Sequence, residues 1–176
     1  MAGAFESQKG ILHCGSCSLK QLAKEVGTPL YVYSRSALVE NFKQFDSAFA
    51  NIPHLVCFAV KANSNLSLLK LFRDLGAGYD IVSGGELFRV RQVGVDPQKV
   101  VFSGVGKKNA EIDYALNSNI LLFNVESKAE LDAIEARGKV LNIKARVSFR
   151  VNPDIDPETH PHISTGLQQH KFGIGM

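Results

Sequence analysis

The 176-residue chain is 45% hydrophobic and 21% charged, which excludes a largely disordered chain and provides enough apolar material for a core. Its formal net charge of +3 is too small an excess to indicate a nucleic-acid partner. It has no run of about 18 apolar residues, and residues 1–10 lack the apolar core of a signal peptide. We therefore expect no membrane partner and a cytoplasmic location.

The N-terminal segment, residues 1–50, predicts two helices and a short strand. Ser18 and Gln21 have the spacing of a capping box, and apolar residues at helical spacing follow them. Leu30–Tyr33 has the composition of a strand. A second helix is predicted from about Ser36.

Strands and helices alternate regularly from Leu55 onward. The predicted strands are Leu55–Val60, Tyr79–Val82, Val100–Phe102, Ile120–Phe123 and Ile143–Val151. This alternation indicates a parallel sheet, either an open doubly wound sheet or part of a (β/α)8 barrel. Residues Lys61–Ser64 lack the glycine-rich loop that a dinucleotide-binding sheet needs after its first strand. We therefore predict that residues 51–176 form an incomplete (β/α)8 barrel with five of its eight strands.

Polar side chains follow the apolar strands at their C-terminal ends, where α/β folds collect their chemistry. These residues are Lys61, Asp80 with Ser83, Ser103, Asn124 and Arg150. Strand alternation puts Lys61 on one face with the small residues Cys57 and Ala59, so we expect it to point along the barrel interior. Apolar walls would disfavour its charged form and let the amine form a Schiff base with an aldehyde. The alternative is a lysine that extends from a strand end into water.

The fifth predicted strand alternates between apolar and polar residues. Its polar face carries Lys144, Arg146, Ser148 and Arg150. In a barrel this face points inward, and Arg150 could hold an anion or a phenolic oxygen; a solvent-exposed sheet face is the alternative. Asp80 could orient a histidine or balance a cation, or be an ordinary strand-end carboxylate. Ser83 and Glu86 form a helix cap, and the adjacent Gly84 and Gly85 could admit an anion.

Cysteine and histidine residues do not indicate a metal site. Cys14 and Cys17 have CxxC spacing, but no second pair completes a zinc site, so we interpret them as reduced thiols near a helix start. Metal or redox chemistry at this pair is the minor alternative. His160 and His162 flank a proline in a stretch that we interpret as a loop over the site.

Four ordered motifs resemble those of the pyridoxal-phosphate-dependent decarboxylases that are built on an alanine-racemase-like barrel. They are Phe58–Asn65, Gly78–Glu86, Phe149–Pro153, and His160–Gly166 followed by Lys171–Gly173. The last motif resembles the diaminopimelate decarboxylases within that superfamily, since ornithine-type relatives share its Lys-Phe-Gly part but not its Ser-Thr-Gly part. The resemblance runs from about Gly27 to the last residue.

The resemblance implies that Lys61 holds pyridoxal 5'-phosphate, that Asp80 lies near the cofactor and that Arg150 lies beside its phenolic oxygen. It implies a homodimeric enzyme that converts meso-2,6-diaminopimelate to L-lysine and CO2. In the family the remaining cofactor contacts, the last barrel strands and a C-terminal β-domain lie further along the sequence, and residues 1–50 contact that domain. We therefore expect this chain to be the N-terminal portion of such an enzyme and to be inactive alone.

Three alternatives remain open at this point. A sister decarboxylase would act on ornithine, arginine or carboxynorspermidine and would release an amine other than lysine. A non-catalytic pyridoxal-phosphate-binding protein would keep the barrel without the β-domain. A shortened pseudo-enzyme would act as the partner of an intact subunit.

Overall fold

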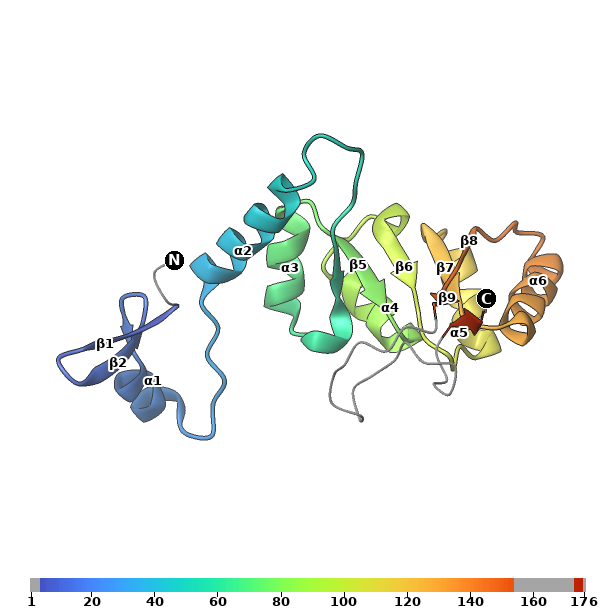
Figure 1. Cartoon of the computed structure of the whole chain (residues 1–176). Helices are drawn as coiled ribbons and strands as arrows, with labels where there is room; N and C mark the ends of the chain where they lie inside the picture. Colours follow the sequence, from blue (N-terminus) through green and yellow to red (C-terminus); the bar gives the residue numbers. More distant parts are fainter. Residues whose placement is uncertain (1–3, 154–172, 176) are drawn as a thin grey trace. The chain divides into compact units, whose positions relative to one another are not determined.

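The computed structural model describes residues 4–153 and 173–175. The chain divides into two compact units, Met1–His54 and Leu55–Met176 (Figure 1). Among the described residues, no helix is long and apolar enough to cross a membrane.

The first unit begins with a three-stranded antiparallel sheet, and two helices follow it. Its elements are β1 (Phe5–Gln8), β2 (Ile11–Cys14), β3 (Cys17–Ser18), α1 (Leu19–Val26) and α2 (Arg35–Ser47). Two-residue turns join the strands: Lys9 and Gly10 both have positive φ, and Gly15 has a φ of +58° in the second turn. Turns of this kind match the twist of a hairpin. The sequence analysis missed this sheet because its strands have at most four residues, too few for a clear alternation.

Both predicted helices of the first unit are confirmed, and the predicted strand is wrong. The Ser18 hydroxyl accepts a hydrogen bond from the Gln21 N–H at 3.4 Å and caps α1. The Ser34 hydroxyl caps α2 in the same way. Leu30–Tyr33 has no regular structure, and the exposed Tyr31 side chain (89%) packs against no strand. Strand composition without a neighbour to pair with does not make a strand.

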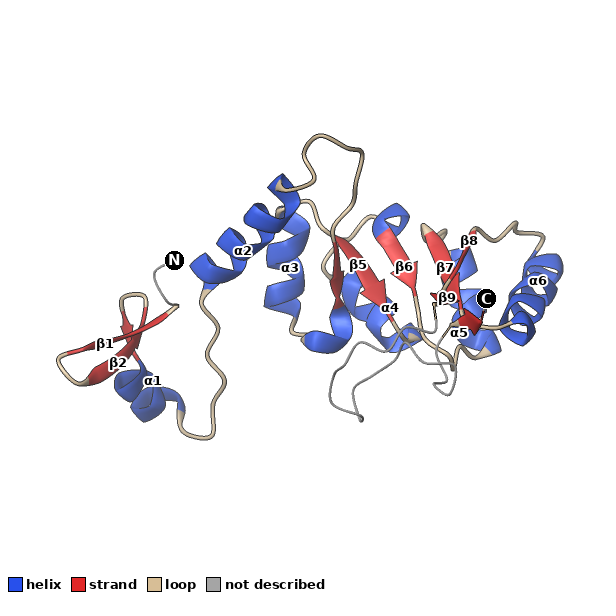
Figure 2. Cartoon of the chain, in the orientation of Figure 1, coloured by secondary structure: helices blue, strands red, loops and turns tan. Residues whose placement is uncertain are grey.

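The second unit is a parallel five-stranded sheet with helices between its strands (Figure 2). Its strands are β4 (Cys57–Ala59), β5 (Gly78–Ile81), β6 (Val100–Phe102), β7 (Leu122–Val125) and β8 (Val147–Phe149). Its helices are α3 (Leu66–Asp74), α4 (Gly84–Gln92), α5 (Asn109–Asn117) and α6 (Lys128–Leu141), with short 3₁₀ helices η1 (Val60–Ala62) and η2 (Pro97–Lys99). A short parallel pair joins β9 (Val151–Asn152) to β10 (Ile174–Gly175).

The strand order decides between the two predicted architectures. Each strand pairs with the next one along the chain, in the order β4-β5-β6-β7-β8, without the reversal that marks a doubly wound sheet. Right-handed crossovers that advance in one direction put their helices on one face of the sheet, as in a barrel. The prediction of a partial (β/α)8 barrel with five strands is therefore confirmed. The fifth strand starts at Val147 instead of Ile143, and β7 starts two residues later than predicted.

Side chains alternate between two chemically different faces of this sheet. One face packs under the helices: the Phe58 ring stacks on Phe72 of α3, with 4.3 Å between centroids, and the Tyr79 hydroxyl donates to the Leu69 carbonyl. The fully buried side chains of this core include Tyr79, Ile81, Phe102, Phe123 and Val125. Burial of each such side chain contributes about 1.5–3 kcal/mol. The other face carries the polar residues of the strand ends.

Gly78, the first residue of β5, lies where the sheet leaves no room for a side chain. A Cβ atom there would lie 2.7 Å from the Cys57 sulfur and 2.7 Å from the Lys99 carbonyl oxygen, and the second of these belongs to the backbone. We expect Gly78→Ala to lower the free energy of unfolding by about 1–3 kcal/mol through overpacking. Urea denaturation followed by circular dichroism measures this change.

Gly85 of α4 is the matched control for this prediction. A Cβ atom there meets only the Ser83 hydroxyl, at 3.8 Å, so Gly85→Ala should raise the stability by about 0.5–1 kcal/mol through helix propensity. Equal stabilities for the two alanine variants would contradict the packing described for β5.

Candidate active site

A cavity of about 430 Å³ opens at the C-terminal ends of the strands. Its walls are formed by Lys61, Asp80, Val82, Ser103, Gly104, Asn124, Glu126 and Arg150. The structure thus brings together the three residues singled out from the sequence, Lys61, Asp80 and Arg150, with the strand-end residues Ser103 and Asn124. Of the predicted strand-end set, Ser83 does not line it.

Lys61 lies in η1, directly after β4. The preceding Val60 is fully buried, whereas Lys61 is exposed and lines the cavity. None of the described residues forms a hydrogen bond or an ion pair with its ammonium group. The expectation of apolar walls is wrong, because Val82 is the one apolar side chain among the described residues that line this cavity. Polar neighbours, and an amine without a partner among the described residues, make Lys61 available to a polar ligand.

A chain of hydrogen bonds links Asp80, Ser103 and Asn124 across three neighbouring strands. The Asn124 Nδ2 atom donates to the Ser103 Oγ at 2.8 Å, and the Ser103 hydroxyl donates to the Asp80 carboxylate. Because the carboxylate only accepts, the donor order is fixed and the Asp80 side chain keeps one orientation. Asp80 pairs in register with Ala59 of β4, so its charge lies beside the strand that ends at Lys61.

Cys57 lies on the same face as Asp80. Burial raises the pKa of its thiol, and the negative charge of Asp80 raises it further. The thiol therefore keeps its proton at neutral pH and adds no charge to the cavity.

Glu126 is a functional-site residue that the sequence analysis missed. Its side chain is 1% exposed and accepts hydrogen bonds from the Arg150 guanidinium at 3.1 and 3.2 Å and from the Gly104 N–H at 3.0 Å. The Gly173 N–H donates to the same carboxylate at 3.3 Å. These donors compensate the cost of burying its charge and hold Arg150 at the cavity. Alternation from Asn124 would have placed Glu126 on the site face.

The Lys107 side chain is buried although it follows a loop. It is 1% exposed and pairs with the Glu130 carboxylate. It also donates to the carbonyl oxygens of Gly104, at 2.8 Å, and Asn124, at 3.0 Å. Glu130 in turn accepts a hydrogen bond from the Glu126 N–H at 2.8 Å. Lys107 and Glu130 therefore fasten the ends of β6 and β7 to the start of α6, directly beneath the cavity residues.

Two other predicted positions have structural roles. The Ser83 hydroxyl accepts from the Glu86 N–H at 3.2 Å and caps α4 as expected. The Gly84 N–H donates to the Glu111 carboxylate at 2.7 Å, so a side chain of this protein already occupies the predicted anion position.

Arg146 does not contribute to the cavity, although its strand face predicted an inward side chain. Its guanidinium donates to the carbonyl oxygens of Ile120 and Leu121 at 2.6 and 2.7 Å. These bonds lie at the N-terminal end of β7, opposite the site. The predicted loop with His160 and His162 lies outside the described residues.

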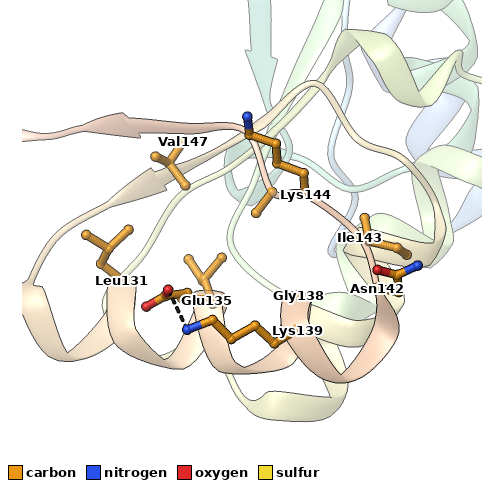
Figure 3. Close-up of a pocket in the computed structure, with 10 residues that line it drawn as sticks. Leu131, Glu135, Gly138, Lys139, Asn142, Ile143, Lys144 and Val147 are labelled. Atoms are coloured by element: carbon orange, nitrogen blue, oxygen red, sulfur yellow. Dashed lines mark ion pairs between the residues drawn. The ribbon is translucent and has the colours of Figure 1, made fainter.

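A second cavity, of about 540 Å³, lies between α6 and β8 (Figure 3). Its apolar lining consists of Leu131, Ile134, Ile143, Ala145 and Val147, and the Lys139–Glu135 ion pair, at 2.7 Å, runs along the helix. Phe149 of β8 is 54% exposed, so the described residues leave part of the apolar face of this strand uncovered. This cavity is away from the strand ends and gathers no set of catalytic side chains.

Comparison with known proteins identifies the family of the chain. Residues 35–176 match the family model described as pyridoxal-dependent decarboxylase, pyridoxal binding domain. The chain belongs to this family.

Its relatives in this family include diaminopimelate decarboxylases. That of Neisseria meningitidis serogroup A is 55% identical over 163 residues, which are 93% of this chain and 40% of the relative. That of Aquifex aeolicus is 50% identical over 172 residues, 98% of this chain and 40% of the relative. The chain thus spans about 40% of the length of these curated relatives.

Solved structures of the same family have the same fold. The diaminopimelate decarboxylase of Helicobacter pylori, complexed with L-lysine, superposes with a TM-score of 0.85 at 48% identity, over 89% of this chain and 40% of the other. That of M. jannaschii, in co-complex with L-lysine, superposes with a TM-score of 0.88 at 39% identity, over 97% and 41%. An arginine decarboxylase of Paramecium bursaria Chlorella virus is 23% identical with a TM-score of 0.64, a likeness of fold alone.

The buried Lys107–Glu130 pair should be essential to stability. We expect Lys107→Met to lower the free energy of unfolding by about 3–5 kcal/mol, because it leaves the Glu130 charge without its partner in a side chain that is only 10% exposed. Urea denaturation measures the loss.

Lys128→Met is the matched control, since Lys128 pairs with Asp132 in the next turn of α6 and is 86% exposed. This variant should unfold at the wild-type urea concentration, because exposed pairs contribute little. Equal effects of the two methionine variants would show that the Lys107 side chain is not buried as described.

Proposed function

We propose that this chain is the lysine-bearing, N-terminal part of a pyridoxal-phosphate-dependent diaminopimelate decarboxylase, which converts meso-2,6-diaminopimelate to L-lysine and CO2. The observation that carries the proposal is the exposed Lys61 amine, which has no partner among the described residues and lies in a cavity at the strand ends. Identities of 50–55% to diaminopimelate decarboxylases support the choice of substrate. The 23% identity to the arginine decarboxylase gives no support to that rival substrate.

The residues of the cavity fit the functional groups of pyridoxal 5'-phosphate. The aldehyde requires a primary amine, which Lys61 provides at the cavity wall. The phenolic oxygen requires a cation, and Arg150 is held at the cavity by the buried Glu126. Asp80 adds a negative charge beside the end of β4, where it stabilises a protonated nitrogen. In the described residues we find no comparable cradle for the phosphate, since Glu111 occupies the Gly84 N–H.

When bound, the cofactor supplies an aldehyde that an amine can bond to and a ring that takes up the electron pair left by the departing carboxylate. Lys61 would hold the cofactor through its amine. Ser103 and Asn124 fix the orientation of the Asp80 carboxylate, which would face the bound cofactor, and Glu126 holds the Arg150 guanidinium at the cavity. The residues of this chain would thus hold and orient the cofactor and set the charge around it.

The domain organisation, the oligomeric state and the location are parts of the same proposal. We propose that residues 1–50 form a segment that contacts a β-domain of the complete polypeptide, and that residues 51–176 form its incomplete barrel. The complete enzyme is a homodimer with a small amino-acid substrate, and this chain alone is inactive. A cytoplasmic location fits its three free cysteines, since a reducing compartment keeps thiols unpaired.

Replacing Lys61 tests the proposal directly. In the complete polypeptide loaded with pyridoxal 5'-phosphate, we expect a visible absorbance band that Lys61→Ala abolishes, because Lys61 is the lysine that lines the cavity among the described residues. The surface variant Lys128→Ala should keep the band. A normal band in Lys61→Ala would contradict the proposal.

Product analysis separates the rival functions. With meso-2,6-diaminopimelate the complete polypeptide should release L-lysine and CO2 in equal amounts. Release of an amine from ornithine, arginine or carboxynorspermidine, without lysine production, would assign a sister decarboxylase. A bound cofactor without CO2 from any of these substrates would assign a non-catalytic carrier.

A further inference from the structure

The hairpin at the start of the chain places two cysteines opposite one another. Cys14 ends β2 and Cys17 begins β3, and the two are partners in the antiparallel register, joined by the turn Gly15–Ser16. Side chains of directly opposed residues project from the same face of a sheet. Both cysteines are free, and Cys17 is exposed. Both thiols precede α1, as the sequence predicted, but their placement on paired strands was not foreseen.

The distance between the opposed positions suits a disulfide. Opposed Cα atoms in an antiparallel pair lie about 4.5–5.5 Å apart. Disulfides join Cα atoms that are about 4.4–6.8 Å apart. The separation expected for these paired positions is therefore within the range that a disulfide spans.

A metal is a poorer fit to this pair. His13 is the nearest histidine in sequence, but it is the strand residue next to Cys14, opposite Glu6 and Ser18, so its side chain projects from the other face. Its Nδ1 atom lies 2.9 Å from the Ile11 carbonyl oxygen. No group of three or more potential ligands forms in the described part of the chain. Two thiols on one face, without further ligands among the described residues, fit thiol–disulfide exchange better than metal binding.

We propose that Cys14 and Cys17 form a reversible dithiol–disulfide site, which low-molecular-weight disulfides such as glutathione disulfide oxidise. This site is independent of the decarboxylase function proposed above, because its residues belong to the other unit of the chain.

The exchange proceeds in two balanced steps. The thiolate of the exposed Cys17 attacks one sulfur of glutathione disulfide, forming a mixed disulfide and releasing one glutathione thiolate. The Cys14 thiolate then attacks the Cys17 sulfur, which closes the ring and releases the second glutathione. The protein loses two electrons to glutathione disulfide, and its two thiol protons end on the two glutathione thiols. A dithiol reductant reverses both steps.

Cys57 serves as an internal reference for this chemistry. It lies on the site face of β4, where burial and the charge of Asp80 raise the pKa of its thiol. The thiolate is the attacking form, so Cys57 should react slowly.

Oxidation of the folded 176-residue chain with glutathione disulfide tests the proposal. After remaining thiols are blocked with N-ethylmaleimide, peptide mass spectrometry should find an internal disulfide between Cys14 and Cys17, and Cys57 carrying the blocking group. Cys14→Ser and Cys17→Ser should each accumulate the glutathione adduct on the remaining cysteine of the pair, and dithiothreitol should remove it. Cys57→Ser should oxidise like the wild type.

The same reaction in urea shows whether the hairpin or mere proximity along the chain brings the thiols together. The ratio of internal disulfide to glutathione adduct should be at least about tenfold higher in the folded chain, because the hairpin has already restricted the motion that ring closure requires. A ratio in buffer no higher than in urea would overturn the proposal. So would glutathione on both cysteines without ring closure, or a disulfide to Cys57 or to a second chain.

Discussion

The parallel sheet directs successive side chains to opposite faces, and the rest of the second unit depends on that constraint. On one face the alternation buries aromatic and branched residues under α3–α6, which supplies the apolar burial that holds the sheet together. On the other face the same alternation presents Asp80 and Asn124, and the residues that continue the strands add Lys61, Ser103 and Glu126. The packing that stabilises the fold thus positions the polar groups of the cavity.

Buried ion pairs and hydrogen bonds connect the C-terminal ends of β6, β7 and β8. Lys107 and Glu130 satisfy each other and the backbone groups of Gly104, Asn124 and Glu126. Charges this deep are tolerated only with partners, so each member depends on the others. Because Glu126 also holds Arg150, the network beneath the cavity determines where the guanidinium lies. The same buried network therefore stabilises the partial barrel and fixes the orientation of the Arg150 side chain at the cavity.

Features that depend on local sequence pattern could be predicted from the sequence. Features that depend on contacts between residues far apart in the chain could not. Apolar runs and caps located β4–β7 and their helices, and the strand ends identified Lys61, Asp80 and Arg150 as candidates. No local pattern distinguishes Lys107 from an exposed loop lysine, since its burial depends on Glu130, far along the chain. The two-residue strand β3 was likewise invisible, and with it the pairing of Cys14 and Cys17. For Leu30–Tyr33 the error is the opposite one: the composition predicted a strand, but the segment has no partner strand and no regular structure.

Identifying the lysine that carries the cofactor tests the central claim most directly. Borohydride reduction of the complete, cofactor-loaded polypeptide fixes the cofactor to the amine that holds it, and peptide mass spectrometry then locates it. The account predicts the pyridoxyl group on Lys61, in the peptide that follows β4. Stoichiometric labelling of another lysine, with Lys61 unmodified, would contradict the account.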